Sequence, residues 1–150
     1  TCWRIGYAAG PKHVIDGMLA LQGQPTFNTS SIAQYAAVAA LTGSQKKLQT
    51  MKKAFTKRRK IVVNTLGKIK GVTFSIPEGA FYCFFSVEQL LNKKYPTSAA
   101  WAKALLEEQR VSVVPGEAFF SPGYVRLSFA AAEEKLKTAL QKIAVFSEQS

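Results

Sequence analysis

Histidine and cysteine are scarce in this sequence, and long apolar runs are missing from it. The single histidine, His13, excludes a histidine-rich metal site and disfavours a Ser-His-Asp catalytic device. The two cysteines, Cys2 and Cys83, lie far apart beside aromatic residues, which predicts buried, reduced thiols and no disulfide framework. No apolar run approaches the ~18 residues that a membrane-spanning helix needs. We therefore expect no membrane partner.

Acidic residues are also scarce, with 9 Asp and Glu against 20 Lys and Arg and a net charge of +11. Such an excess is typical of proteins that bind nucleic acid or an anionic surface. It equally fits one part of a larger protein whose remainder carries the acidic residues. With 150 residues, of which 47% are hydrophobic and 19% charged, the chain has the length and composition of one folded domain.

The chain lacks an initial methionine and a recognisable signal peptide. We therefore expect further sequence before Thr1, including any targeting segment. Reduced cysteines favour a cytoplasmic location, and a plastid would fit them as well.

The apolar pattern predicts helices and strands in an α/β or α+β arrangement. The Ala-rich segment 30–42 has small residues along one side, which predicts a closely packed and largely buried helix. We expect strands at 3–9, 72–76, 80–87, 111–114 and 124–129, and helices at 11–22, 30–42, 45–67, 98–109 and 132–147.

The pattern also suggests a division of the chain near residue 43. A single strand at 3–9 leaves both of its edges unpaired, and the two apolar helices after it have no sheet to pack on. Residues 1–43 are therefore interpreted as the tail of another domain, and residues 44–150 as a domain that begins with a long interdomain helix.

Two arginines stand within apolar strand patterns. Because strand side chains alternate between faces, Arg4 shares a face with Cys2, Gly6 and Ala8. Arg126 likewise lies on the face opposite Val125 and Leu127 and shares its own face with Tyr124, Ser128 and Ala130, so we expect small neighbours to leave room beside both arginines. A buried guanidinium needs an anion, and its planar fork suits a carboxylate or a phosphate. That anion is either a structural Asp or Glu of the protein or a bound ligand.

Four segments in this order resemble class I and II aminotransferases, which use pyridoxal phosphate and have fold type I. The segments are TCWRIGYAAGP, SIAQYAAVAAL, PEGAFYCFF and VVPGEAFFSPGYVRLSFA, and together they cover nearly the whole chain. They are most similar to the bacterial-type aspartate and prephenate aminotransferase branch. The resemblance implies the last strand and helices of the large domain followed by an α+β C-terminal small domain.

The resemblance implies roles for the two arginines. Arg4 corresponds to the arginine that binds the cofactor phosphate, and Arg126 to the arginine that binds the substrate α-carboxylate. The Schiff-base lysine of the family would lie upstream of Thr1, and Lys12 does not match it. The segment alone is therefore expected to be inactive.

Two further residues are assigned to the substrate site by the same resemblance. Phe81 lies in the PEGAF motif near the substrate or, alternatively, is a core aromatic residue. Asn28 stands where the family often has Ser-Asn-Pro, near the subunit interface. The chain departs from the family at Cys2, where Gly is usual, and at Phe120, where Gly is common; we expect Phe120 to stiffen or fill the loop before Arg126.

The resemblance implies an enzyme that moves an amino group from an aspartate-like amino acid to a 2-oxo acid through pyridoxal phosphate. It also implies a homodimer and leaves the amino donor open. One rival is a nucleic-acid-binding module built on the eight basic residues between Lys46 and Lys60, although that segment lacks the interleaved exposed aromatics needed for base stacking. We therefore expect no nucleic-acid partner. The other rival is a non-catalytic interaction fragment.

Overall fold

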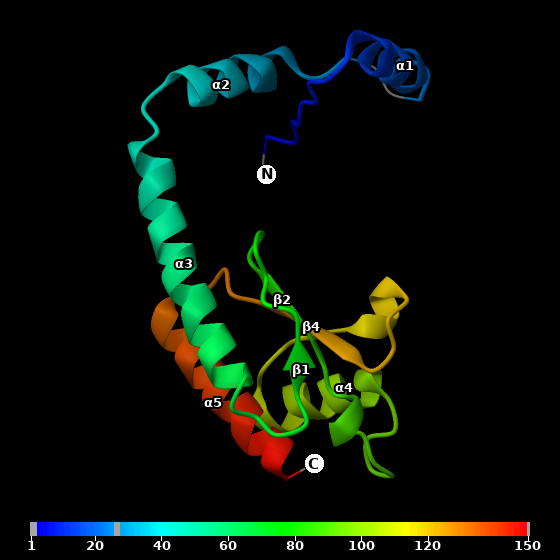
Figure 1. The fold of residues 1–150 in the computed structure, drawn as a ribbon, viewed down its shortest axis with the longest axis vertical. Helices are drawn as coiled ribbons and strands as arrows, with labels where there is room; N and C mark the ends of the chain where they lie inside the picture. The colour runs from blue at the N-terminus through cyan, green and yellow to red at the C-terminus, as the bar shows by residue number, and fades with distance from the viewer. Residues whose placement is uncertain (1–2, 26–27, 150) are drawn as a thin grey trace. The chain divides into compact units, whose positions relative to one another are not determined.

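The chain forms two compact units in the computed structural model, which describes residues 3–25 and 28–149 (Figure 1). The first unit comprises residues 1–49 and the second residues 50–150. The division falls inside α3 (Lys46–Leu66), the longest helix, which contributes to both units.

The first unit contains α1 (Lys12–Gln22), α2 (Ser31–Thr42) and the start of α3, so both helices predicted before residue 43 are confirmed. The expectation that α2 is largely buried is wrong. Ala33 is its one buried residue, and Ile32, Tyr35 and Leu41 are exposed. Small and apolar residues create a surface that can be buried, but burial also requires a partner surface, and the described part of this unit supplies none.

The strand predicted at 3–9 is also wrong. Residues 4–10 are irregular, and no described residue pairs with them in a sheet. Arg4 has a left-handed φ of 49°, which interrupts the alternation of side chains between two faces. Strand alternation therefore does not place the Arg4 side chain on one face with small residues. Its assignment to a phosphate group is what the family resemblance implies.

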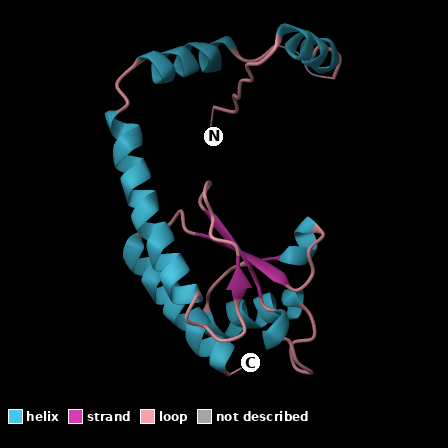
Figure 2. Ribbon diagram, in the orientation of Figure 1, coloured by secondary structure: helices cyan, strands magenta, loops and turns pink. Residues whose placement is uncertain are grey.

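The second unit is a four-stranded antiparallel sheet with helices on one face (Figure 2). The strand order is β1-β2-β4-β3, with β1 at Thr73–Phe74, β2 at Tyr82–Ser86, β3 at Val114–Pro115 and β4 at Tyr124–Ser128. The predicted strands at 72–76, 80–87 and 124–129 are confirmed, although β1 has two residues; the strand predicted at 111–114 is largely wrong, because β3 shares only Val114 with it. The short helical turns are η1 (Glu88–Leu90) and η2 (Gly116–Phe119), and the further helices are α4 (Ser98–Gln109) and α5 (Glu133–Glu148).

The core lies between the sheet and the helices. Side chains at every second position of β2 and β4 are buried there, and α3, α4 and α5 contribute the opposing layer. Its largest fully buried members are Trp101, Phe85, Phe129, Phe146, Leu66, Leu105, Leu140 and Ile143. The other face of the sheet is not covered by these helices and remains accessible.

Cys83 lies in this core as a free thiol, as predicted. Burial raises the pKa of the Cys83 thiol from 9.0 to about 11, so the thiol stays protonated and unreactive at neutral pH. Cys2, the other predicted buried thiol, lies outside the described residues.

Candidate anion-binding site

Arg126 lies in the middle of β4, on the sheet face that the helices leave open. It stands opposite Phe84 on β2 and Val114 on β3, and its side chain is half-buried. Its strand neighbours Val125 and Leu127 are buried on the other face. The alternation predicted from the sequence of β4 is therefore confirmed.

Aromatic rings surround the Arg126 guanidinium. Its central carbon lies 4.4 Å from the centre of the Tyr82 ring and 4.4 Å from the centre of the Phe119 ring. Phe84 stacks on Tyr124 at 5.2 Å and meets Phe119 edge-on at 6.1 Å. The expectation of small neighbours was incomplete, because it considered only residues on the same strand and missed the aromatic residues that approach from β2 and η2.

No carboxylate among the described residues pairs with Arg126; the ion pairs of this part of the chain involve lysines. A structural Asp or Glu therefore does not explain this residue within the described chain. The central carbon of the guanidinium lies over both rings, and no hydrogen bond or ion pair within the described residues occupies its five N–H donors. The donors remain available for a bidentate carboxylate or phosphate.

A hollow of about 480 Å³ borders the same face of the sheet. Tyr82, Phe84 and Tyr124, which surround or neighbour Arg126, form one side of it, and residues 73–77 form the other. The hollow combines aromatic rings with the hydroxyl groups of Thr73, Ser75, Tyr82 and Tyr124. The hollow thus adjoins residues that neighbour Arg126 on the open face, although Arg126 itself is not among its lining residues.

Phe81 lies at the end of this arrangement, immediately before β2. Its ring is 4.4 Å from that of Tyr82 and 6.0 Å from that of Phe55 on α3, and its side chain is 38% exposed. The structure therefore places Phe81 one ring away from Arg126, while its other contact is with the edge of the core. Phe81 lies outside the core cluster, so it is not a core aromatic residue, and its place near the substrate stays a prediction.

The η2 turn that carries Phe119 is anchored to the start of α4. Glu117 accepts hydrogen bonds from Ser98 Oγ at 2.8 Å and from the Ala99 N–H at 3.2 Å, and the Gly123 N–H donates to Ser98 Oγ at 2.9 Å. Partial desolvation raises the pKa of Glu117, but these hydrogen bonds outweigh it and leave that pKa below 4.5. The charged Glu117 therefore ties both ends of the loop to the domain at neutral pH.

Phe120 follows this turn with a φ of 54° and a side chain that is 98% exposed. The expectation that it fills the loop before Arg126 is therefore wrong. The left-handed backbone gives a physical reason for a glycine at this place, because a β-carbon is disfavoured at positive φ and glycine is not.

We expect Phe120→Gly to raise the free energy of unfolding by about 0.5 to 1 kcal/mol. Relief of left-handed strain contributes about 1 to 2 kcal/mol, and the greater freedom of glycine in the unfolded chain offsets part of it. Urea unfolding of the two proteins measures the difference. Phe120→Ala is the matched control, because it removes the exposed ring but keeps the strained β-carbon; an equal gain in both variants would contradict the strain argument.

The other two predicted site residues belong to the first unit. Arg4 is exposed and forms no ion pair with a described residue, and a β-carbon at Gly6 would meet nothing within 4 Å. Free guanidinium donors with open space beside them fit a phosphate group. Asn28 is exposed in the loop between α1 and α2.

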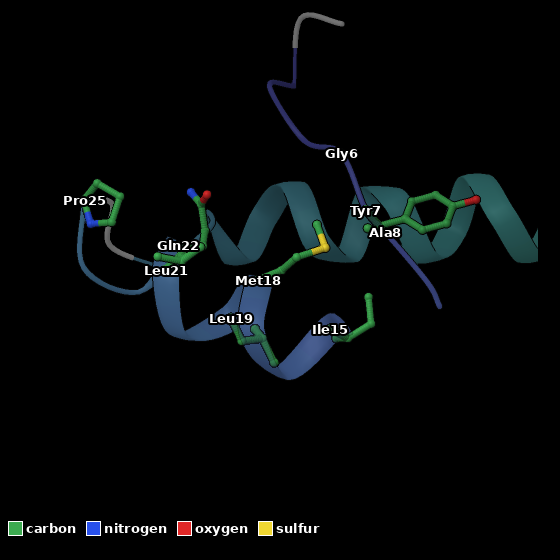
Figure 3. A pocket seen from close by; sticks show the side chains of 9 residues that line it. All are labelled: Gly6, Tyr7, Ala8, Ile15, Met18, Leu19, Leu21, Gln22 and Pro25. Atoms are coloured by element: carbon green, nitrogen blue, oxygen red, sulfur yellow. The ribbon is translucent and has the colours of Figure 1, made fainter. Parts of the chain in front are cut away.

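The first unit also has an apolar hollow of about 790 Å³ (Figure 3). Side chains of α1, including Met18 and Leu19, line it together with Tyr7 from the irregular segment. Its lining includes no charged side chain, so it does not resemble a phosphate site. Its exposed apolar residues instead form a surface suited to packing against further protein.

The basic face of α3 makes several contacts within the protein. Lys57 pairs with Glu133 at 2.7 Å, the Arg58 guanidinium lies 5.3 Å from the Phe55 ring, and Arg59 donates to the Pro77 carbonyl at 2.9 Å. The Lys57 and Arg59 contacts bind α3 to α5 and to the loop before β2, whereas the Arg58 contact lies within α3. Neither α3 nor any other helix in the described ranges is sufficiently long and apolar to cross a membrane.

Comparisons with known proteins agree on one family. The family model described as aminotransferase class I and II matches residues 1–143. An aspartate/prephenate aminotransferase of Cereibacter sphaeroides is 47% identical over 97% of this chain, and an aspartate aminotransferase of Geobacillus stearothermophilus is 44% identical over 99% of it. Each match spans 38% of the relative's own length.

Solved structures show the same relationship. The crystal structure of the aspartate aminotransferase from Rhizobium meliloti matches 98% of this chain and 38% of its own, with a TM-score of 0.82 and 41% identity. The resemblance inferred from the four sequence segments is confirmed, as is the mixed helix-and-sheet fold of a fold type I aminotransferase. The chain belongs to the aminotransferase class I and II family, whose members depend on pyridoxal phosphate.

Proposed function

We propose that the full-length protein containing this chain is a pyridoxal-phosphate-dependent aminotransferase that transfers an amino group between an aspartate-like amino acid and a 2-oxo acid. Arg126 carries this proposal. Its guanidinium is half-buried on the open face of the sheet, is held between aromatic rings and has no carboxylate partner among the described residues. Both substrates of an aminotransferase carry the α-carboxylate that such a group binds.

The chain contributes binding and orientation. Pyridoxal phosphate, when bound, supplies the electron sink for the chemistry at the α-carbon. We assign Arg4 to its phosphate, Arg126 to the substrate carboxylate, Phe81 to the border of the substrate site and Asn28 to the neighbourhood of the subunit interface. Each anion contact would limit the motion of the group that it holds, and such restriction is a major source of rate acceleration.

The proposal extends to the organisation of the protein. Residues 1–43 would complete a large cofactor-binding domain and residues 44–150 would form the small domain of a cytoplasmic homodimer. The exposed apolar side chains of α1 and α2 and the hollow beside them support this view, because such surfaces are ordinarily covered in a folded protein. The cofactor-binding lysine would come from the rest of the protein, so residues 1–150 alone would not catalyse transamination.

The test compares the full-length protein with a chain of residues 1–150, each mixed with pyridoxal phosphate, aspartate and 2-oxoglutarate. We expect glutamate to form rapidly with the full-length protein and at the free-cofactor rate with the short chain. Activity of the short chain above that background would refute its inactivity. A full-length protein that converts neither aspartate nor other amino acids would refute the enzyme proposal and favour an interaction fragment.

We expect Arg4→Ala to weaken retention of pyridoxal phosphate by the full-length protein, because a phosphate would lose a charged, bidentate donor. Two charge-assisted hydrogen bonds contribute about 1.5 to 3 kcal/mol each, so the affinity should fall about 100-fold or more. Cofactor absorbance after dialysis measures retention. Lys12→Ala removes one positive charge from the same unit and should leave retention unchanged; equal loss in both variants would contradict the assignment of Arg4.

A further inference from the structure

We propose that Tyr82 and Phe119 are positioning residues that hold the Arg126 guanidinium in the orientation required to bind a substrate carboxylate. This inference rests on the proposed function, because it concerns the same carboxylate site. It assigns a role to one residue of β2 and one residue of the η2 turn, neither of which the sequence pattern of β4 singles out.

The two ring contacts can orient the Arg126 guanidinium without occupying its N–H donors. Each ring lies 4.4 Å from the central carbon of Arg126, within the distance of a cation–π contact. A carboxylate binds along the N–H edge of the guanidinium, in its plane. Ring contacts centred on the guanidinium carbon therefore restrict movement of the side chain without forming hydrogen bonds to its N–H groups.

Both rings are themselves held by other aromatic residues. Tyr82 contacts Phe81 at 4.4 Å, and Phe119 meets Phe84 edge-on at 6.1 Å. The η2 turn that carries Phe119 is further tied to α4 through Glu117 and Ser98. The supports of Arg126 are therefore fixed before a ligand arrives, which lowers the entropy cost of binding.

Packing of the core does not explain these two aromatic residues. Tyr82 points to the open face of the sheet, and Phe119 is 39% exposed. Neither belongs to the hydrophobic core cluster of the second unit. An exposed aromatic ring contributes less to stability than a buried one, so the contact with Arg126 is the feature that these positions share.

The experiment uses the full-length, cofactor-loaded protein with Tyr82→Leu, Phe119→Leu and the double variant. We expect each single change to raise KM for aspartate, and the dissociation constant of a non-reacting dicarboxylate such as maleate, by about three- to tenfold. Retention of pyridoxal phosphate should not change. Tyr82→Phe and Phe119→Tyr keep the rings and should retain normal affinity.

Phe120→Leu is the matched control, since Phe120 directly follows Phe119, has a side chain that is 98% exposed and makes no ring contact with Arg126 in the described part of the chain. Equal losses in Phe120→Leu, or normal maleate affinity in both Tyr82→Leu and Phe119→Leu, would overturn the positioning role. Arg126→Ala separates the assignment of Arg126 to the substrate carboxylate from the positioning role of Tyr82 and Phe119. If it binds maleate normally, the carboxylate assignment fails; if it alone loses maleate, only the positioning role fails.

Discussion

Replacing Arg126 with alanine in the full-length protein is expected to lower kcat/KM for aspartate by about 100-fold or more. The substrate carboxylate would lose two charge-assisted hydrogen bonds, which contribute about 1.5 to 3 kcal/mol each. The loss should appear chiefly in KM, because binding is weakened before the reaction begins. Steady-state kinetics with aspartate and 2-oxoglutarate measure both parameters.

Arg126→Lys tests whether charge alone is sufficient. Lysine keeps the positive charge but lacks the planar fork that binds a carboxylate bidentately and whose central carbon lies over the Tyr82 and Phe119 rings. We expect an intermediate loss. Lys103→Ala removes one charge at an exposed site on α4 and should have little effect. Comparable losses in Arg126→Ala and Lys103→Ala would indicate general electrostatic attraction and would contradict a specific site.

The second large effect is expected at Gly116, the first residue of η2. A β-carbon there would lie 2.0 Å from the Ser121 carbonyl oxygen and 2.7 Å from the Tyr124 carbonyl oxygen. Both atoms belong to the backbone and cannot rotate away, and the Ser121 N–H donates to the Gly116 carbonyl across the same turn. Gly116→Ala should therefore lower the free energy of unfolding by about 3 kcal/mol, as overpacking does in a well-packed site.

Chemical unfolding of the variant measures this loss, and near-ultraviolet circular dichroism reports the displaced aromatic cluster. The same shift of the loop would move Phe119 away from Arg126, so carboxylate affinity should fall with stability. Gly79→Ala is the matched control, because a β-carbon at Gly79 would meet nothing within 4 Å. A Gly116→Ala protein as stable as Gly79→Ala would show that the loop is not packed as described.

Patterns among neighbouring residues were sufficient to predict the helices and strands whose formation depends mainly on local sequence. The predicted helix at 98–109 matches α4, and local contacts close both of its ends: the Thr97 side chain accepts from the Ala100 N–H, and Arg110 ends the helix with a left-handed φ of 57°. Strands β2 and β4 were found because alternating residues have a core to face. The errors at 3–9 and in α2 arose where the expected structure depends on partner surfaces that the described residues do not supply.

The sequence by itself determined that Arg126 lies opposite the core. Period-two alternation is a local property of a strand, and the apolar Val125 and Leu127 leave only the other face for a charged neighbour. Tertiary structure alone decided what surrounds that charge. The register of β2 against β4 and the turn at η2 bring Tyr82 and Phe119 to it from positions 44 and 7 residues earlier in the sequence, and no local pattern specifies such a pairing.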